Sequence, residues 1–128
     1  MSQAVSLIIP TYNRAQHFRD ALTSALRQSY RPLEIIVVDD GSRDETASVV
    51  EALADDRVRY IRQPANRGPN ANWRAGMKAV SGEIFGFLAD DDRLHPDYVQ
   101  RVAMPLCEDE TLGLSFCDHW VIDSPGAR

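Results

Sequence analysis

The sequence has few of the residues that mark disulfide-linked, membrane-spanning or nucleic-acid-binding proteins. It contains two cysteines, Cys107 and Cys117, without CxxC spacing, and we interpret both as buried thiols of a reducing compartment. No apolar run approaches the roughly 18 residues that a membrane span requires. Positive charges are scattered among acidic ones, and the net charge is −5, which argues against nucleic-acid binding.

The first residues also lack the basic segment of a signal peptide and lead directly into an apolar, strand-like run. Together with the thiols, this predicts a cytoplasmic protein, either free or at the cytoplasmic face of a membrane. The length of 128 residues and the hydrophobic content of 44% fit one compact domain.

Strand-like and helix-like segments alternate along the whole chain. Apolar, β-branched runs predict strands over 5–9, 33–38, 58–61, 83–88 and 112–117, the last resuming over 119–122. Apolar residues at helical spacing predict helices over 15–28, 44–54, 70–80 and 96–106. The alternation predicts an α/β fold with a mostly parallel, Rossmann-like sheet and helices on both faces. The segment 123–128 is interpreted as a turn.

Three consecutive aspartates, Asp90, Asp91 and Asp92, follow the apolar segment 84–89. Carboxylates this close together raise one another's cost of ionisation, and a hard divalent cation such as Mg²⁺ or Mn²⁺ would relieve it. Such cations often bridge to substrate phosphates, so the cluster predicts a phosphate-bearing ligand. The alternative is a solvated acidic turn ahead of the helix that begins near Pro96.

A second acidic pair, Asp39 and Asp40, follows the apolar segment 33–38. Ligands of open α/β sheets bind outside the carboxyl ends of the strands. Right-handed crossovers place the loops after the first, second and fourth strands along one edge, so both acidic strand ends are predicted to face one pocket. We interpret Asp39 as structural, capping the helix that follows by accepting hydrogen bonds from its N–H groups.

Four motifs at the ends of the predicted elements carry a family resemblance. They are Pro10-Thr11-Tyr12-Asn13-Arg14, Val37-Val38-Asp39-Asp40-Gly41-Ser42, Asn66-Arg67-Gly68 and Phe87-Leu88-Ala89-Asp90-Asp91-Asp92. In this order and spacing the chain resembles family 2 glycosyltransferases from Val5 to about Trp120. These are inverting enzymes of the GT-A fold that use nucleotide-diphosphate sugars. The resemblance implies that this chain is the nucleotide-binding half of that fold.

The resemblance implies roles for five residues at a nucleotide site. Pro10 and Tyr12 correspond to the base pocket, with Tyr12 against the nucleobase. Asp40 corresponds to an aspartate that accepts a hydrogen bond from the imide N–H of uracil, which suits a carboxylate because it only accepts, and UDP is the implied nucleotide. Asn66 and Gly68 correspond to the nucleotide-binding loop, where they are also natural loop formers.

The Asp cluster corresponds to the ribose and metal contacts of the family. The resemblance implies that Asp90 contacts the ribose and that Asp91 binds Mn²⁺ or Mg²⁺, with Asp92 orienting the site. The family pattern often places an aspartate two residues before the metal ligand, and Ala89 stands there. Asp90 and Asp92 do have that spacing, which leaves Asp92 as an alternative metal ligand.

The implied reaction is metal-assisted transfer of a sugar, with inversion, to a saccharide, lipid or protein acceptor. In the resembling family the general base lies in an acceptor-binding segment well beyond the Asp cluster, and only 36 residues follow Asp92. We therefore expect residues 1–128 to form a single nucleotide-diphosphate-sugar-binding domain, truncated before that segment and without the catalytic base. One Asp-His pair, Asp118 and His119, is too weak a signal to supply it.

Two other functions fit part of the sequence. A non-catalytic nucleotide-sugar-binding or partner-docking module would also lack a general base, and it remains the main alternative. A receiver-type phosphorelay domain has a similar length and fold class. Its acidic pair, however, follows the first strand, where this chain has Pro10-Thr11-Tyr12, and no lysine after Lys78 can serve as its strand-end lysine.

Overall fold

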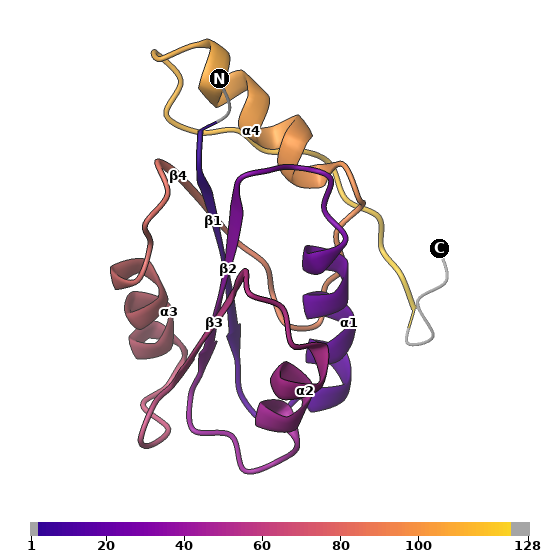
Figure 1. The fold of residues 1–128 in the computed structure, drawn as a ribbon, viewed down its shortest axis with the longest axis vertical. Coiled ribbons are helices and arrows are strands. Elements are labelled where there is room, and N and C mark those ends of the chain that lie inside the picture. The colour runs from indigo at the N-terminus through magenta and orange to yellow at the C-terminus, as the bar shows by residue number, and fades with distance from the viewer. Residues whose placement is uncertain (1–2, 124–128) are drawn as a thin grey trace.

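The computed structural model describes residues 3–123, in which strands and helices alternate (Figure 1). The elements are β1 (Val5–Thr11), α1 (Ala15–Leu26), β2 (Leu33–Asp39), α2 (Thr46–Leu53), β3 (Val58–Arg62), α3 (Pro69–Lys78), β4 (Ile84–Phe87) and α4 (Tyr98–Glu108). The four strands pair in parallel in the order β3-β2-β1-β4. The α/β prediction is confirmed, and the sheet is entirely parallel.

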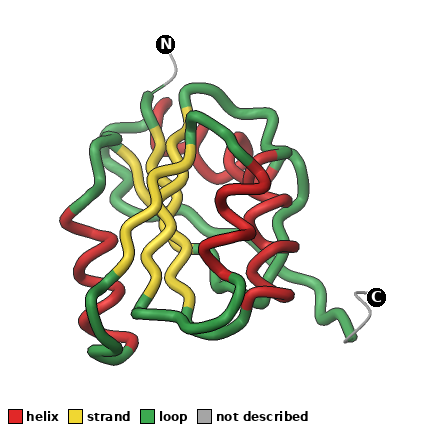
Figure 2. Tube along the Cα trace, turned by 60° about the horizontal axis from the view of Figure 1, so that its bottom comes forward, coloured by secondary structure: helices red, strands yellow, loops and turns green. Residues whose placement is uncertain are grey.

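Helices cover both faces of this sheet. Helix α3 lies on one face, and α1 and α2 lie on the other (Figures 1 and 2). The central strands are apolar on both sides because successive side chains of a strand point to opposite faces. Ile8, Ile36 and Val38 form the core beneath α3. Leu7, Ile9, Ile35 and Val37 pack in the larger core with α1 and α2 residues.

Helix α3 approaches the sheet closely at Gly76. A Cβ atom built there would lie 2.6 Å from Cγ2 of Ile8 and 3.0 Å from Cγ2 of Val38. Glycine is therefore the residue that lets α3 pack directly on β1 and β2. This packing fixes the position of the loop that precedes α3, which belongs to the site described below.

The prediction of a fifth strand is wrong. Within the described part of the chain, residues 109–123 after α4 form no strand, and Leu114 and Phe116 are 77% and 85% exposed. A run with β propensity becomes a strand only when another strand pairs with its backbone groups. Residues 124–128 of the expected terminal turn lie outside the described residues.

The prediction that both cysteines are buried is wrong. Both thiols are free, but Cys107 is only partly buried and Cys117 is exposed, since the strand expected to bury it does not form. None of the helices within residues 3–123 has the length and apolar character to cross a membrane.

Candidate functional site

A cavity of about 370 Å³ lies where the carboxyl ends of β1, β2 and β4 meet the start of α3. Its lining residues are Pro10, Thr11, Tyr12, Arg14, Asp40, Asn66, Gly68, Pro69, Asn72, Trp73, Ala89, Asp90 and Asp91. All six residues predicted to bind nucleotide are among them, together with Asp91. The structure therefore brings the two acidic strand ends to one pocket, while the roles of the individual residues stay predictions.

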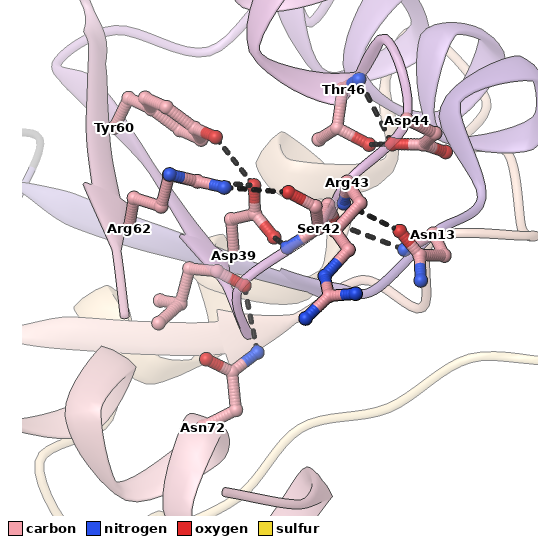
Figure 3. A network of polar contacts seen from close by, with 10 residues as sticks. Asn13, Asp39, Ser42, Arg43, Asp44, Thr46, Tyr60, Arg62 and Asn72 are labelled. Carbon is pink, nitrogen blue, oxygen red and sulfur yellow. Dashed lines mark hydrogen bonds and ion pairs between the residues drawn. The ribbon is translucent and has the colours of Figure 1, made fainter. Parts of the chain in front are cut away.

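The loop after β1 is hydrogen-bonded to the loop after β2 through a side chain from each loop, Asn13 and Ser42 (Figure 3). The Asn13 backbone N–H donates to Oγ of Ser42 at 2.9 Å, and the Arg43 N–H donates to Oδ1 of Asn13 at 2.8 Å. Asp44 accepts from the backbone N–H of Ala15, the first residue of α1, at 2.9 Å. These contacts hold the backbone on both sides of Arg14, which lines the cavity.

Asp39 is buried next to these two loops, and both of its carboxylate oxygens accept hydrogen bonds (Figure 3). Its Oδ1 accepts from the Ser42 backbone N–H at 2.8 Å, and its Oδ2 accepts from the hydroxyl of Tyr60. Nε of Arg62 lies 4.0 Å from Oδ2 of Asp39. Burial and the bond to Asp39 raise the pKa of Tyr60, which keeps the hydroxyl a donor. The structural interpretation of Asp39 is confirmed, but the prediction that it caps the following helix is wrong, because its N–H partner, Ser42, lies in the turn before α2.

Asp40 is also buried, at 2% exposure, and both of its oxygens accept backbone hydrogen bonds. The N–H groups of Arg67 and Gly68 donate to Oδ1 and Oδ2, each at 2.9 Å. Gly68 has a φ of 90°, a conformation that other residues rarely adopt. Asp40 therefore shapes the loop at Asn66 to Gly68. An ionised carboxylate has about four lone pairs, so two oxygens that each accept one hydrogen bond can still accept another from a ligand.

Asp90 and Asp91 have different partners from the first acidic pair. Oδ2 of Asp90 accepts from the hydroxyl of Thr11 at 2.9 Å. The guanidinium of Arg14 then bridges both carboxylates, with Nη1 at 3.3 Å from Oδ1 of Asp90 and 3.1 Å from Oδ2 of Asp91. The Asp90 side chain is 11% exposed, whereas the Asp91 side chain is 51% exposed. Asp91 thus faces the open side of the cavity.

These two carboxylates fit a divalent cation. Both converge on one nitrogen atom, and Mg²⁺ or Mn²⁺ is commonly held by one or two carboxylates together with waters and substrate phosphates. Within residues 3–123, no group of three or more His, Cys, Asp or Glu side chains is arranged to hold a metal ion. Asp92 is exposed, and its backbone N–H closes a turn onto the Ala89 carbonyl. Its assignment as a metal ligand stays a prediction.

Sequence reasoning gave no site role to six lining residues, and four of these have polar or aromatic side chains, the other two being Pro69 and Ala89. Thr11 and Arg14 stand inside the first motif, and their position beside Pro10 and Tyr12 was the available signal. Asn72 is buried and donates from Nδ2 to the Val38 carbonyl at 2.7 Å, and among the described residues its Oδ1 has no hydrogen-bond partner. No sequence signal marked this amide.

The fourth is Trp73, which is 45% exposed. Its ring stacks on Phe87, with centroids 4.5 Å apart and an interplanar angle of 21°. One part of the indole therefore packs against β4, and the rest is available to the cavity. A neighbouring cavity of about 440 Å³ shares Arg14 and Asp91 with the first. Its other lining residues are His17, Asp20, Arg93, Ile122 and Asp123.

Sequence comparisons place this arrangement among glycosyltransferases. The family model described as "Glycosyl transferase family 2" matches residues 6–118. An uncharacterized glycosyltransferase of Rickettsia typhi is 35% identical over 95% of this chain and 38% of that protein. The GalNAc(5)-diNAcBac-PP-undecaprenol beta-1,3-glucosyltransferase of Campylobacter jejuni is 45% identical over 70% of this chain and 30% of that protein. The chain spans about a third of the length of these relatives.

Solved structures agree with the sequence relatives. S. aureus TarS 1-349 in complex with UDP-GlcNAc is 28% identical with a TM-score of 0.77, over 84% of this chain and 32% of that chain. The mannosyltransferase PcManGT from Pyrobaculum calidifontis, in complex with GDP-Man and Mn²⁺, is 26% identical with a TM-score of 0.71, over 77% of this chain and 31% of that chain. On these matches, the chain belongs to glycosyl transferase family 2 and has its GT-A-type fold.

Proposed function

We propose that the chain is the donor-binding portion of an inverting glycosyltransferase that uses a UDP-linked sugar and a divalent cation, Mn²⁺ or Mg²⁺. The observation that carries this proposal is the cavity at the carboxyl ends of β1, β2 and β4, where both acidic strand ends meet. A sugar nucleotide has a base, a ribose and a diphosphate. The cavity offers one group of side chains for the base and another for the diphosphate, and Asp90, in the second group, is also the predicted ribose contact.

The base is assigned to the part of the cavity near Tyr12, Asp40 and Asn66. Tyr12 is 43% exposed, which leaves its ring available for stacking on a nucleobase. A lone pair of Asp40 would accept the imide N–H of uracil, and cytosine has no such proton. Guanine does carry one, so the preference for UDP over GDP rests on the smaller pyrimidine ring and on the UDP and UDP-GlcNAc complexes of the TarS neighbour.

The diphosphate is assigned to the side of the cavity formed by Asp90 and Asp91. Bound there, a divalent cation supplies Lewis-acid stabilisation of the charge that develops on the departing diphosphate. Asp91 would hold the cation from the open side, and Thr11 orients Asp90 from below through its hydroxyl. The Mn²⁺ in the PcManGT complex supports this assignment by analogy.

Inversion requires one displacement at the anomeric carbon and a general base for the acceptor hydroxyl. Among the described residues, no carboxylate beyond Asp92 lines the donor cavity, so the base and the acceptor are left to be identified. The Campylobacter jejuni relative is named for an undecaprenol-linked saccharide. A lipid-linked saccharide at the cytoplasmic face of a membrane is accordingly one acceptor to test, beside free saccharides and proteins.

Calorimetry with UDP, CDP and GDP, each with excess Mn²⁺ and with chelator, tests the proposal. UDP should bind in the presence of Mn²⁺, should bind more weakly with chelator, and should bind more tightly than CDP or GDP. A folded chain that binds none of the three with Mn²⁺ would refute the donor site. Equal affinities for UDP and CDP would refute the assignment of Asp40 alone. Transfer of sugar from a UDP-sugar to an acceptor by this chain would show that it supplies the general base itself, contrary to the expectation from its sequence.

A further inference from the structure

We propose that Arg14 is an exchangeable counter-cation that occupies the cation position between Asp90 and Asp91 until metal and diphosphate arrive together. The inference deepens the proposed function and rests on it. It concerns how two ligands of opposite charge become coupled in the donor site. In the absence of ligand the arginine neutralises the carboxylates, and in the complex it moves to the diphosphate.

The geometry of the side chain carries this argument. A single nitrogen, Nη1 of Arg14, contacts both carboxylates, at 3.3 and 3.1 Å. A cation shared by Asp90 and Asp91 would occupy the same space. Two positive charges at one point repel each other strongly, so guanidinium and metal exclude one another there. Binding of the metal therefore requires the arginine side chain to leave.

The side chain is free to move, whereas its backbone is not. Arg14 is the N-cap residue of α1, and its carbonyl accepts the N–H of Phe18 at 2.9 Å. The neighbours on both sides, Asn13 and Ala15, are tied to the loop after β2. The Arg14 side chain is nevertheless 53% exposed, and Arg14 lines both cavities. The side chain of Arg14 can change rotamer while its backbone stays in place.

The displaced guanidinium gains a doubly charged partner when a diphosphate is present. Arginine binds phosphate oxygens through strong, charge-assisted hydrogen bonds. Metal alone must displace Arg14 without a phosphate to receive it, and a diphosphate alone meets carboxylates that Arg14 only partly neutralises. Both ligands together let every charge find a partner. Mn²⁺ should therefore bind weakly by itself and much more tightly with UDP, and Arg14 should be the cause of that coupling.

Replacement of Arg14 by glutamine separates the two binding events. Mn²⁺ binding without nucleotide, measured by electron paramagnetic resonance of free Mn²⁺, should become about three- to tenfold tighter in Arg14→Gln, because the carboxylates lose their internal cation. UDP binding at saturating Mn²⁺ should become about tenfold weaker, because the diphosphate loses a charged donor. The opposite signs distinguish this role from a loss of structure, which would weaken both.

Arg93 provides a matched control. It follows the Asp cluster in sequence and carries the same charge, but it pairs with Asp20 at 2.7 Å and does not line the donor cavity. Arg93→Gln should change neither affinity by more than about twofold. Arg14→Lys keeps the charge, so its Mn²⁺ affinity should stay near that of the unmodified chain.

Two results would overturn the inference. The first is an unchanged or weakened Mn²⁺ affinity in a folded Arg14→Gln chain, with melting temperature as the test of folding. The second is an Arg14→Lys chain that gains as much Mn²⁺ affinity as Arg14→Gln, since charge would then not be the cause. Either result leaves UDP binding by the unmodified chain, and with it the proposed function, intact. If the unmodified chain binds no nucleotide, the proposed function fails instead, and the Mn²⁺ measurements still decide the role of Arg14.

Discussion

The two acidic strand ends look alike in the sequence but are neutralised in different ways. At the end of β2, Asp39 and Asp40 are buried and accept hydrogen bonds from backbone N–H groups and from Tyr60. After β4, Asp90 and Asp91 are paired mainly through the half-exposed guanidinium of Arg14. The first set of partners is built into the backbone. The second depends on one partly exposed side chain.

This difference assigns the two ends different tasks. Backbone donors cannot leave without unfolding a loop, so the end of β2 acts as a framework that fixes the surrounding loops. A guanidinium can be exchanged for another cation, so the end of β4 is suited to a charged ligand. Substitutions at the β2 end should therefore reduce stability, whereas those at the β4 end should reduce ligand affinity and leave stability nearly unchanged.

The largest expected effect is that of Asp39→Ala on stability. The substitution leaves the Ser42 N–H and the Tyr60 hydroxyl without their acceptor in a buried network, which should lower the free energy of unfolding by about 2–4 kcal/mol. Urea denaturation measures this. Asp91→Ala is the control and should cost less than about 1 kcal/mol, since its ion pair is half-exposed. Equal losses in the two variants would erase the proposed contrast between the strand ends.

The next effect concerns the affinity for nucleotide at the β4 end. Asp91→Ala should weaken Mn²⁺-dependent UDP binding by about 2 kcal/mol, because diphosphate and Asp90 then lack a bridging cation. Asp92→Ala is the comparison, since Asp92 is exposed and outside the cavity lining. Calorimetry with and without Mn²⁺ checks both. If Asp92→Ala loses the metal dependence and Asp91→Ala keeps it, the metal ligand is Asp92.

Asp40→Asn tests a residue that fixes a loop, as expected at the β2 end, and is also proposed to contact the ligand, as expected at the β4 end. An amide in place of the carboxylate keeps one acceptor but points its N–H₂ group at the N–H of Arg67 or Gly68. UDP affinity should fall by about 1–2 kcal/mol through the base contact, and stability by about 1 kcal/mol through the loop. A folded variant with unchanged UDP affinity would leave Asp40 as a framework residue only.

Much of the fold was predictable because its signals are local. Apolar, β-branched runs bounded by turn residues marked all four strands, and helix boundaries differed where tertiary contacts decided them. Helix α1 ends at Leu26 and not at Gln28, whose side chain bonds to the His95 carbonyl and the Val99 N–H. The fifth strand failed for the same reason, since pairing depends on a partner strand that the run itself does not encode.

The features of the site also differ in whether local sequence signals or tertiary contacts determine them. Convergence of the acidic strand ends follows from topology alone, and so it could be expected from the sequence. The partners of each carboxylate could not. Asp40 is satisfied by backbone groups 27 and 28 residues later, and Asp90 by the hydroxyl of Thr11, 79 residues earlier. Such long-range hydrogen bonds leave no periodic pattern in the sequence.

The smallest expected effect lies at Asp44, where the framework meets solvent. Burial raises the pKa of this carboxyl, but hydrogen bonds from the Thr46 hydroxyl and from the backbone N–H groups of Ala15 and Thr46 lower it more, so the folded pKa lies below the ordinary value of 3.8. The charged form is thus favoured in the folded state. Its contribution to stability is complete above the unfolded pKa and is lost as the pH falls through the folded one.

Asp44→Asn should therefore lower the free energy of unfolding by about 0.5–1 kcal/mol at pH 7, as expected for a capping carboxylate, and by less as the pH falls below 4. Urea denaturation of both chains between pH 7 and pH 3 measures the difference. Asp118→Asn, in the exposed segment after α4, is the control and should show little difference at any pH. A constant gap between Asp44→Asn and the unmodified chain across this range would mean that Asp44 acts by shape and not by charge. The charge of Asp44 would then not stabilise the loops at the β2 end, and the contrast with the β4 end would rest on Asp39 and Asp40 alone.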